Sequence, residues 1–74
     1  MDDTGAYYLK VREQVAEADL NAGGPLQVTV VQADTTGTLF SVNTDQSGLI
    51  GLMRHLNGRG LLLLSLHREG LVTP

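Results

Sequence analysis

The first part of the chain contains a short stretch in which apolar and polar residues alternate. Tyr7, Leu9 and Val11 are apolar, and the residues between and after them include Lys and Arg. Alternation with a period of two is typical of a half-buried strand, because successive side chains of a strand point to opposite faces. The pattern therefore predicts a strand over residues 6–12.

The residues after this strand have helical character. The stretch "EQVAEADL" consists mostly of good helix formers, and the following "NAGGP" supplies the glycines and proline that end a helix. A short helix over 13–21 is expected. A single helix over 6–20 is the alternative, because Tyr8, Val11 and Val15 also have helical spacing.

The middle of the chain has the pattern of a β-hairpin. "LQVTVVQA" is rich in β-branched residues and predicts a strand over 26–33, and "TLFSVN" predicts a return strand over 38–43. The polar turn between them contains Gly37, which can adopt a positive φ angle. The two strands are expected to pair in antiparallel orientation.

The second half predicts a capped helix followed by a strand. Leu49, Leu52 and Leu56 have the spacing of one helix face, and Asp45 is a good N-cap residue. The leucine-rich run after Gly60 is too short for another helix and predicts a strand. One side of that strand is expected to carry Leu62, Leu64 and Leu66, and the other side Leu61 and Leu63.

These elements predict an α+β fold of the ferredoxin-like βαββαβ type. Such a fold has a four-stranded antiparallel sheet with two helices on one face, and the first helix here is short. The expected organisation is one domain over residues 1–74. In chain order it comprises a flexible arm over 1–5, strand 6–12, helix 13–21, strands 26–33 and 38–43, helix 46–58, strand 61–68 and a tail over 70–74.

The helices of this fold leave one sheet face uncovered, and the pattern predicts an apolar surface there. A chain of 74 residues without cysteine has a small core and no disulfides, so association with another chain is the remaining common source of stability. We therefore expect a homodimer, or a complex with another protein, that forms through this open face. Its expected interface residues are Val31, Leu39, Leu61, Leu63, Ser65 and His67.

The stretch "TDQSGLIGLMRHLNGRGLLLL" resembles the turn-and-helix signature of ACT domains. The residues that carry the resemblance are Asp45, Gly48, Leu49, Leu56, Gly60 and Leu62. The signature follows the first strand in ACT domains but the third predicted strand here. In that family the turn often lines an amino-acid site at a subunit interface, since free N–H groups at a helix start can bind a carboxylate. The resemblance implies a ligand site formed by Thr44, Asp45, Gln46, Ser47, Gly48 and Leu49.

A second resemblance covers more of the chain. The strand "YYLKV" at Tyr7–Val11 and the stretch Asp45–Leu66 are similar to small stand-alone bacterial proteins of unknown function. Those proteins end in a "D-Q-x-x-L-x-G-L" helix followed by a "G-L-x-L-L-S-[LV]" strand. The aromatic pair that they often carry in the first helix is missing here. The resemblance implies the fold and a free-standing role, and it implies no activity.

Composition limits the partners and the chemistry. The net charge of −3 disfavours nucleic acid as a partner, and no apolar run reaches the roughly 20 residues that span a bilayer. The acidic start does not resemble a secretory leader, so a cytoplasmic protein is expected. His55 and His67 lack the spacing of a metal site, and no nucleophile with a base or phosphate-binding loop is present. We expect neither an enzyme nor a bound cofactor or metal.

Two functions follow from these observations. The first is a non-enzymatic, homo-oligomeric interaction or adaptor module, which is indicated by the leucine-rich last strand in a chain without a chemical motif. The alternative is an ACT-like domain that senses an amino acid through residues 44–49.

Overall fold

The computed structural model describes residues 4–69, which form six elements in the order β–α–β–β–α–β. The elements are β1 Gly5–Val11, α1 Glu17–Asn21, β2 Thr29–Asp34, β3 Gly37–Thr44, α2 Gln46–Gly58 and β4 Leu63–Arg68. Residues 1–3 of the expected arm and the expected tail over 70–74 lie outside the described residues. The alternative of one helix over 6–20 is wrong, because its first half is strand β1.

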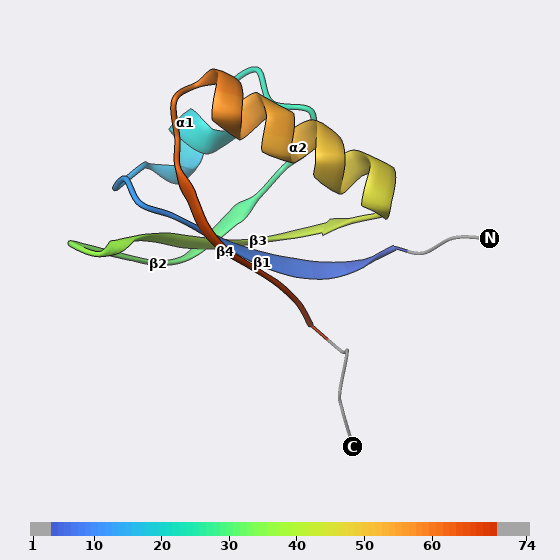
Figure 1. The fold of residues 1–74 in the computed structure, drawn as a ribbon, viewed down its shortest axis with the longest axis horizontal. Helices are drawn as coiled ribbons and strands as arrows, with labels where there is room; N and C mark the ends of the chain where they lie inside the picture. Colours follow the sequence, from blue (N-terminus) through green and yellow to red (C-terminus); the bar gives the residue numbers. More distant parts are fainter. Residues whose placement is uncertain (1–3, 70–74) are drawn as a thin grey trace.

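The four strands form one antiparallel sheet in the order β2-β3-β1-β4. Strand β3 lies between β1 and β2, and β1 lies between β3 and β4, so each βαβ unit is split by a strand of the other. Both helices lie on the same face of the sheet (Figure 1). The chain therefore has the ferredoxin-like α+β fold that the sequence predicted.

The core lies between the sheet and the two helices. Strand β1 alternates as expected, with the odd-numbered residues from 7 to 11 buried under the helices. Helix α2 contributes the predicted leucine stripe, and Leu20 is the buried residue of α1. The buried apolar residues are Tyr7, Leu9, Val11, Leu20, Val28, Phe40, Val42, Leu49, Leu52 and Leu56.

Helix α1 begins at Glu17, four residues later than the sequence predicted. The preceding segment is held by tertiary hydrogen bonds. The fully buried Thr38 hydroxyl accepts from the backbone N–H of Val15 at 2.9 Å and donates to the carbonyl of Glu13 at 2.8 Å. A carboxylate oxygen of Glu13 also accepts from the N–H of Leu62. These bonds fix an extended connection where residue propensities alone favour a helix.

The β2–β3 hairpin is present, with Asp34 opposite Gly37 across a two-residue turn. Gly37 has φ +138, and a Cβ at this position would lie 2.1 Å from the carbonyl oxygen of Val11. Only glycine fits between the turn and β1. Strand β2 begins at Thr29 rather than at residue 26, and the backbone of Val28, just before it, is bound by the Asn21 side chain of α1.

Candidate interaction surface

Strand β4 lies at one edge of the sheet. Its inner side pairs with β1, and within residues 4–69 no strand pairs with its outer side. The backbone N–H and C=O groups on the outer side of an edge strand can pair with another chain. From Gly60 to His67 the sequence contains no Lys, Arg, Asp, Glu or Pro, the residue types that commonly protect an edge strand.

A β-bulge determines which leucines of this region face the helices. Ser65 lies opposite Lys10, whereas Leu63 lies opposite Val11, so Leu64 is an extra residue in β4. In a bulge, two residues oppose one residue of the partner strand. Leu63 and Leu64 therefore both oppose the buried Val11 and point to the helix side.

The bulge corrects two of the predicted interface residues. Leu61 and Leu63 were expected on the open face, but both are half-buried and pack against the core on the helix side. The sequence reading assumed strict alternation through the leucine run. One extra residue inverts the face of every residue before it, which is why that assignment is wrong.

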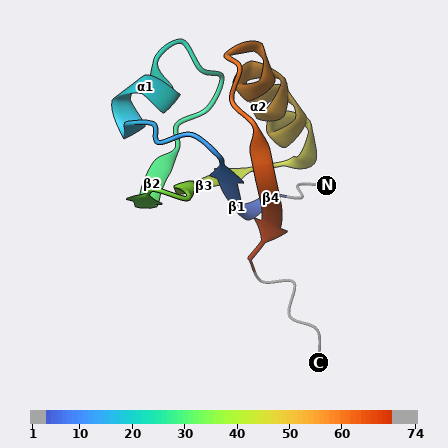
Figure 2. The ribbon, with the colours of Figure 1, turned by 60° about the vertical axis from the view of Figure 1, so that its left-hand side comes forward.

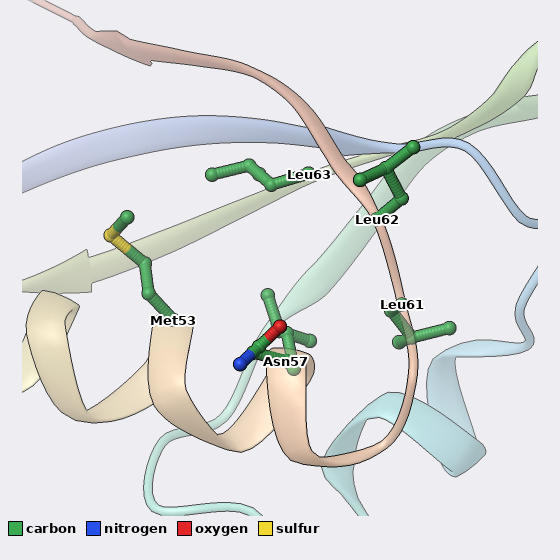
Figure 3. A pocket seen from close by; sticks show the side chains of 6 residues that line it. Met53, Asn57, Leu61, Leu62 and Leu63 are labelled. Carbon is green, nitrogen blue, oxygen red and sulfur yellow. The ribbon is translucent and has the colours of Figure 1, made fainter.

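An apolar groove lies between α2 and the start of β4. It has a volume of about 290 Å³ and is lined by Met53, Leu56, Asn57, Leu61, Leu62 and Leu63. Figure 3 shows Met53 and Asn57 of the helix on one side and the leucines before and within β4 on the other. The groove is thus continuous with the exposed leucines of β4.

The exposed apolar side chains concentrate beside this groove. Leu62, Leu64 and Leu66 are 50%, 49% and 43% exposed, and Ile50 of α2 is 47% exposed. Ile50 precedes Met53 by three residues, so the two share one helix face. We call this area the β4 edge surface; it consists of Ile50, Met53, Leu62, Leu64 and Leu66.

The opposite edge of the sheet is covered at the start of β2 by side chains of α1. A Glu17 carboxylate oxygen accepts from the N–H of Val30 at 2.8 Å. The Asn21 amide accepts from the N–H of Val28 at 2.7 Å and donates to the Val28 carbonyl at 3.1 Å. A second bulge, at Val31, disrupts this strand further. Figure 2 shows α1 on the β2 side of the sheet and α2 on the β4 side.

The open face of the sheet is more polar than the sequence predicted. Of the expected apolar residues, Leu39 lies there and is half-buried, opposite Lys10 and Gln32. Ser65 and His67 also lie on this face, opposite Lys10 and Tyr8. One row across the four strands consists of Thr29, Ser41, Tyr8 and His67. A mainly apolar open face, the expected reason for dimerisation, is therefore absent from the part of the chain described.

Two hydrogen-bonded pairs at the sheet periphery shift pKa values. The Tyr8 hydroxyl donates to a Glu69 carboxylate oxygen at 2.7 Å, and this bond and the negative charge raise the pKa of Tyr8. Asp34 accepts from the hydroxyl and from the backbone N–H of Thr36, which lowers the pKa of Asp34. Both groups are partly exposed, and the pairs lie at the end of β4 and in the hairpin turn.

The turn predicted to bind a ligand is the N-terminus of α2. The Asp45 carboxylate accepts from the N–H of Gly48 at 2.8 Å, so the helix start is capped by the chain itself. Thr44 is buried, and a Cβ on Gly48 would lie 2.0 Å from its hydroxyl oxygen, so Gly48 makes room for Thr44. Leu49 packs in the core. Gln46 and Ser47 are exposed. Ligand binding by residues 44–49 stays a prediction.

The two histidines lie apart. The Nε2 atom of His55 is buried beside Gly24 and has no hydrogen-bond partner, whereas His67 is exposed on the open face. Within residues 4–69 no three His, Asp or Glu side chains are grouped in a way that could hold a metal ion.

Comparison of the chain with family models, curated proteins and solved structures gave no match. None of the helices within residues 4–69 is both long and apolar enough to cross a membrane.

Proposed function

We infer that the protein is a small homo-oligomeric interaction module that associates with a second copy of itself through the β4 edge surface. The observation that carries this function is the concentration of half-exposed leucines just before and on an edge strand whose residues 63–67 carry no protecting charge, with Arg68 at its end. Isolated exposed leucines are common on protein surfaces, but a contiguous set beside an apolar groove marks an interaction site.

The energetics are compatible with a dimer of moderate affinity. Burying a half-exposed leucine contributes about 1–1.5 kcal/mol, so the six leucines that two copies provide contribute roughly 6–9 kcal/mol. Association costs about 4–15 kcal/mol in lost freedom. Backbone hydrogen bonds between the two edges, worth about 0.5–1.5 kcal/mol each, then decide whether the dimer is stable. At the favourable end of these ranges two such bonds leave a net gain of about 8 kcal/mol, so a dissociation constant of about 1 µM is the tightest that these figures allow.

A second copy fits this surface better than a charged partner does. The residues between Gly60 and His67 carry no formal charge, so two copies meet there without repulsion even though the whole chain has a net charge of −3. The domain is small, and association is the common way in which chains of this size add apolar burial.

The test is the molar mass in solution, measured by size-exclusion chromatography with light scattering at about 10–200 µM protein, a range that lies above the tightest dissociation constant these figures allow. The unmodified protein should elute as a dimer at the upper end of this range. Leu64→Lys should produce a monomer, because each copy then places a charge in the contact. Far-UV circular dichroism should show that the variant remains folded, since residue 64 is exposed.

Val31→Lys is the matched control. Val31 is 53% exposed and belongs to β2, the edge covered by α1. This variant should remain dimeric. A monomeric unmodified protein at 200 µM would overturn the proposed function. Loss of the dimer in Val31→Lys but not in Leu64→Lys would show that the chains associate through the β2 edge instead of the β4 edge.

A further inference from the structure

We propose that the two copies pair their β4 strands in antiparallel orientation about a two-fold axis at Leu66, so that both sheets join into one continuous sheet. This inference rests on the proposed function, because it specifies how the β4 edge surface meets its own copy.

The hydrogen bonds of β4 determine which backbone groups are directed outward. The N–H of Glu69 donates to the carbonyl of Ala6 in β1 at 2.8 Å, so residue 69 directs its backbone groups inward. Backbone groups of alternate residues point to the same side of an antiparallel strand. His67 and Ser65 therefore also face β1, where they lie opposite Tyr8 and Lys10. Leu66, between them, directs its N–H and C=O toward the outer edge.

Pairing rules leave few possible registers. In an antiparallel ladder, residues directly opposite each other must both direct their backbone groups toward the partner or both direct them away. A symmetric contact can therefore centre on 65, 66 or 67. A centre at 65 requires Leu64, at the bulge where the ladder is disrupted, in both central hydrogen-bonded pairs. A centre at 66 needs Leu64 only for the outer pairs, opposite Arg68 of the partner subunit. A centre at 67 brings two copies of His67 together on the open face.

A two-fold axis at Leu66 gives both paired backbone hydrogen bonds and apolar side-chain contacts between the two copies. Leu66 of each copy lies opposite Leu66 of the other, and two N–H···O=C bonds form between them. Leu66 faces the helix side, because it lies opposite the buried Leu9. The leucine pair is then on the same side of the joined sheet as Leu64 and Met53. Leu64 and Leu66 of both copies thus lie on the helix side of the joined sheet. In each chain α2 covers that side next to β4 (Figure 2).

The experiment uses single cysteines, which are unambiguous because the chain contains none. Residues opposite each other in a hydrogen-bonded pair have Cα atoms about 5.5 Å apart, within the range that a disulfide spans. Oxidised Leu66→Cys should form a covalent dimer. Leu64→Cys should not, because residue 64 lies roughly 13 Å along the strand from its own copy in this register.

A second arm does not alter Leu66. In the proposed register Ser65 lies opposite His67 of the partner subunit, with Cα atoms about 4.5 Å apart. A mixture of Ser65→Cys and His67→Cys should therefore give a disulfide-linked heterodimer, while each variant alone should stay unlinked. Both positions are exposed, so neither substitution threatens folding.

The outcomes separate this inference from the proposed function. Self-linking of Ser65→Cys or His67→Cys overturns the register at Leu66. A dimer by light scattering in which none of the cysteine variants link overturns the strand pairing and leaves the proposed function intact. A monomer at every concentration overturns both.

Discussion

The two βαβ halves of the molecule have the same topology but use their helices differently. In the first half, the five-residue α1 covers the outer edge of β2 with two polar side chains. In the second half, the thirteen-residue α2 covers the core with a leucine stripe and leaves the outer edge of β4 accessible. The β2 edge is covered at its start by the chain itself, whereas the β4 edge retains backbone groups that a second chain can pair with.

The closed edge depends on a match between helical and strand spacing. Glu17 and Asn21 are four residues apart on α1, which corresponds to about 6 Å along a helix axis. Val28 and Val30 are two residues apart in extended chain, which corresponds to about 6.6 Å. One helical turn can therefore satisfy two successive outward-facing positions of β2. A short helix is sufficient for this task, whereas covering the core requires the longer α2.

The largest effect is expected from removing the side chain that closes β2. Asn21→Ala leaves both backbone groups of the buried Val28 without a partner, which should cost about 2–4 kcal/mol in the free energy of unfolding. Urea denaturation followed by circular dichroism measures this change. Asn43→Ala, which alters an exposed asparagine of β3, should change stability by less than about 0.5 kcal/mol. Equal effects of the two variants would show that the Asn21 bonds do not hold the edge.

A smaller effect is expected at the start of α2. Asp45→Ala removes the acceptor of the Gly48 N–H and should lower the free energy of unfolding by about 1 kcal/mol. Asp45→Ser retains a capping oxygen and should be close to neutral. Thermal unfolding of the three proteins measures the difference.

The same series tests the ACT-like alternative. If the turn acts only as a cap, amino acids should leave the midpoint of thermal unfolding unchanged. An amino acid that stabilises the unmodified protein but not Asp45→Ser would show that this turn binds a ligand. The second half of the molecule would then contain a ligand site as well as an accessible strand edge.

The sequence predicted the second half better than the first, apart from its final strand. Helix α2 occupies 46–58 as expected, because its N-cap and its leucine stripe are local signals. The start of α1 and of β2 depends on bonds from Thr38 and Asn21 to residues distant in sequence, and no local pattern contains them. Residue type within 13–16 favours helix, and the tertiary bonds override that preference.

The sequence placed the predicted association on the open face of the sheet, whereas the candidate surface lies at the β4 edge. The leucine-rich strand contributes to both, but its four consecutive leucines contain no alternation from which a face can be assigned. Ser65 and His67 fix the polar positions and correctly place Leu64 and Leu66 on the helix side. A bulge places Leu63 on the same side, and Ile50 of α2 is exposed. Both features depend on tertiary packing, which the sequence pattern does not predict.

The smallest effect is expected at the turn where the closed edge ends. The Thr36 hydroxyl is the main cause of the lowered pKa of Asp34, and the Thr36 backbone N–H is the second. A lowered pKa means that the folded state binds the proton more weakly than the unfolded state does. The stabilisation is therefore present above the unfolded-state pKa and is lost as the pH falls through the folded-state value. Thr36→Val should raise the pKa of Asp34 toward its ordinary value and reduce this acid sensitivity. Carboxyl-carbon NMR titration measures the shift, with Thr35→Val as the control in the same turn. An unchanged Asp34 pKa in Thr36→Val would show that the backbone N–H alone holds the turn.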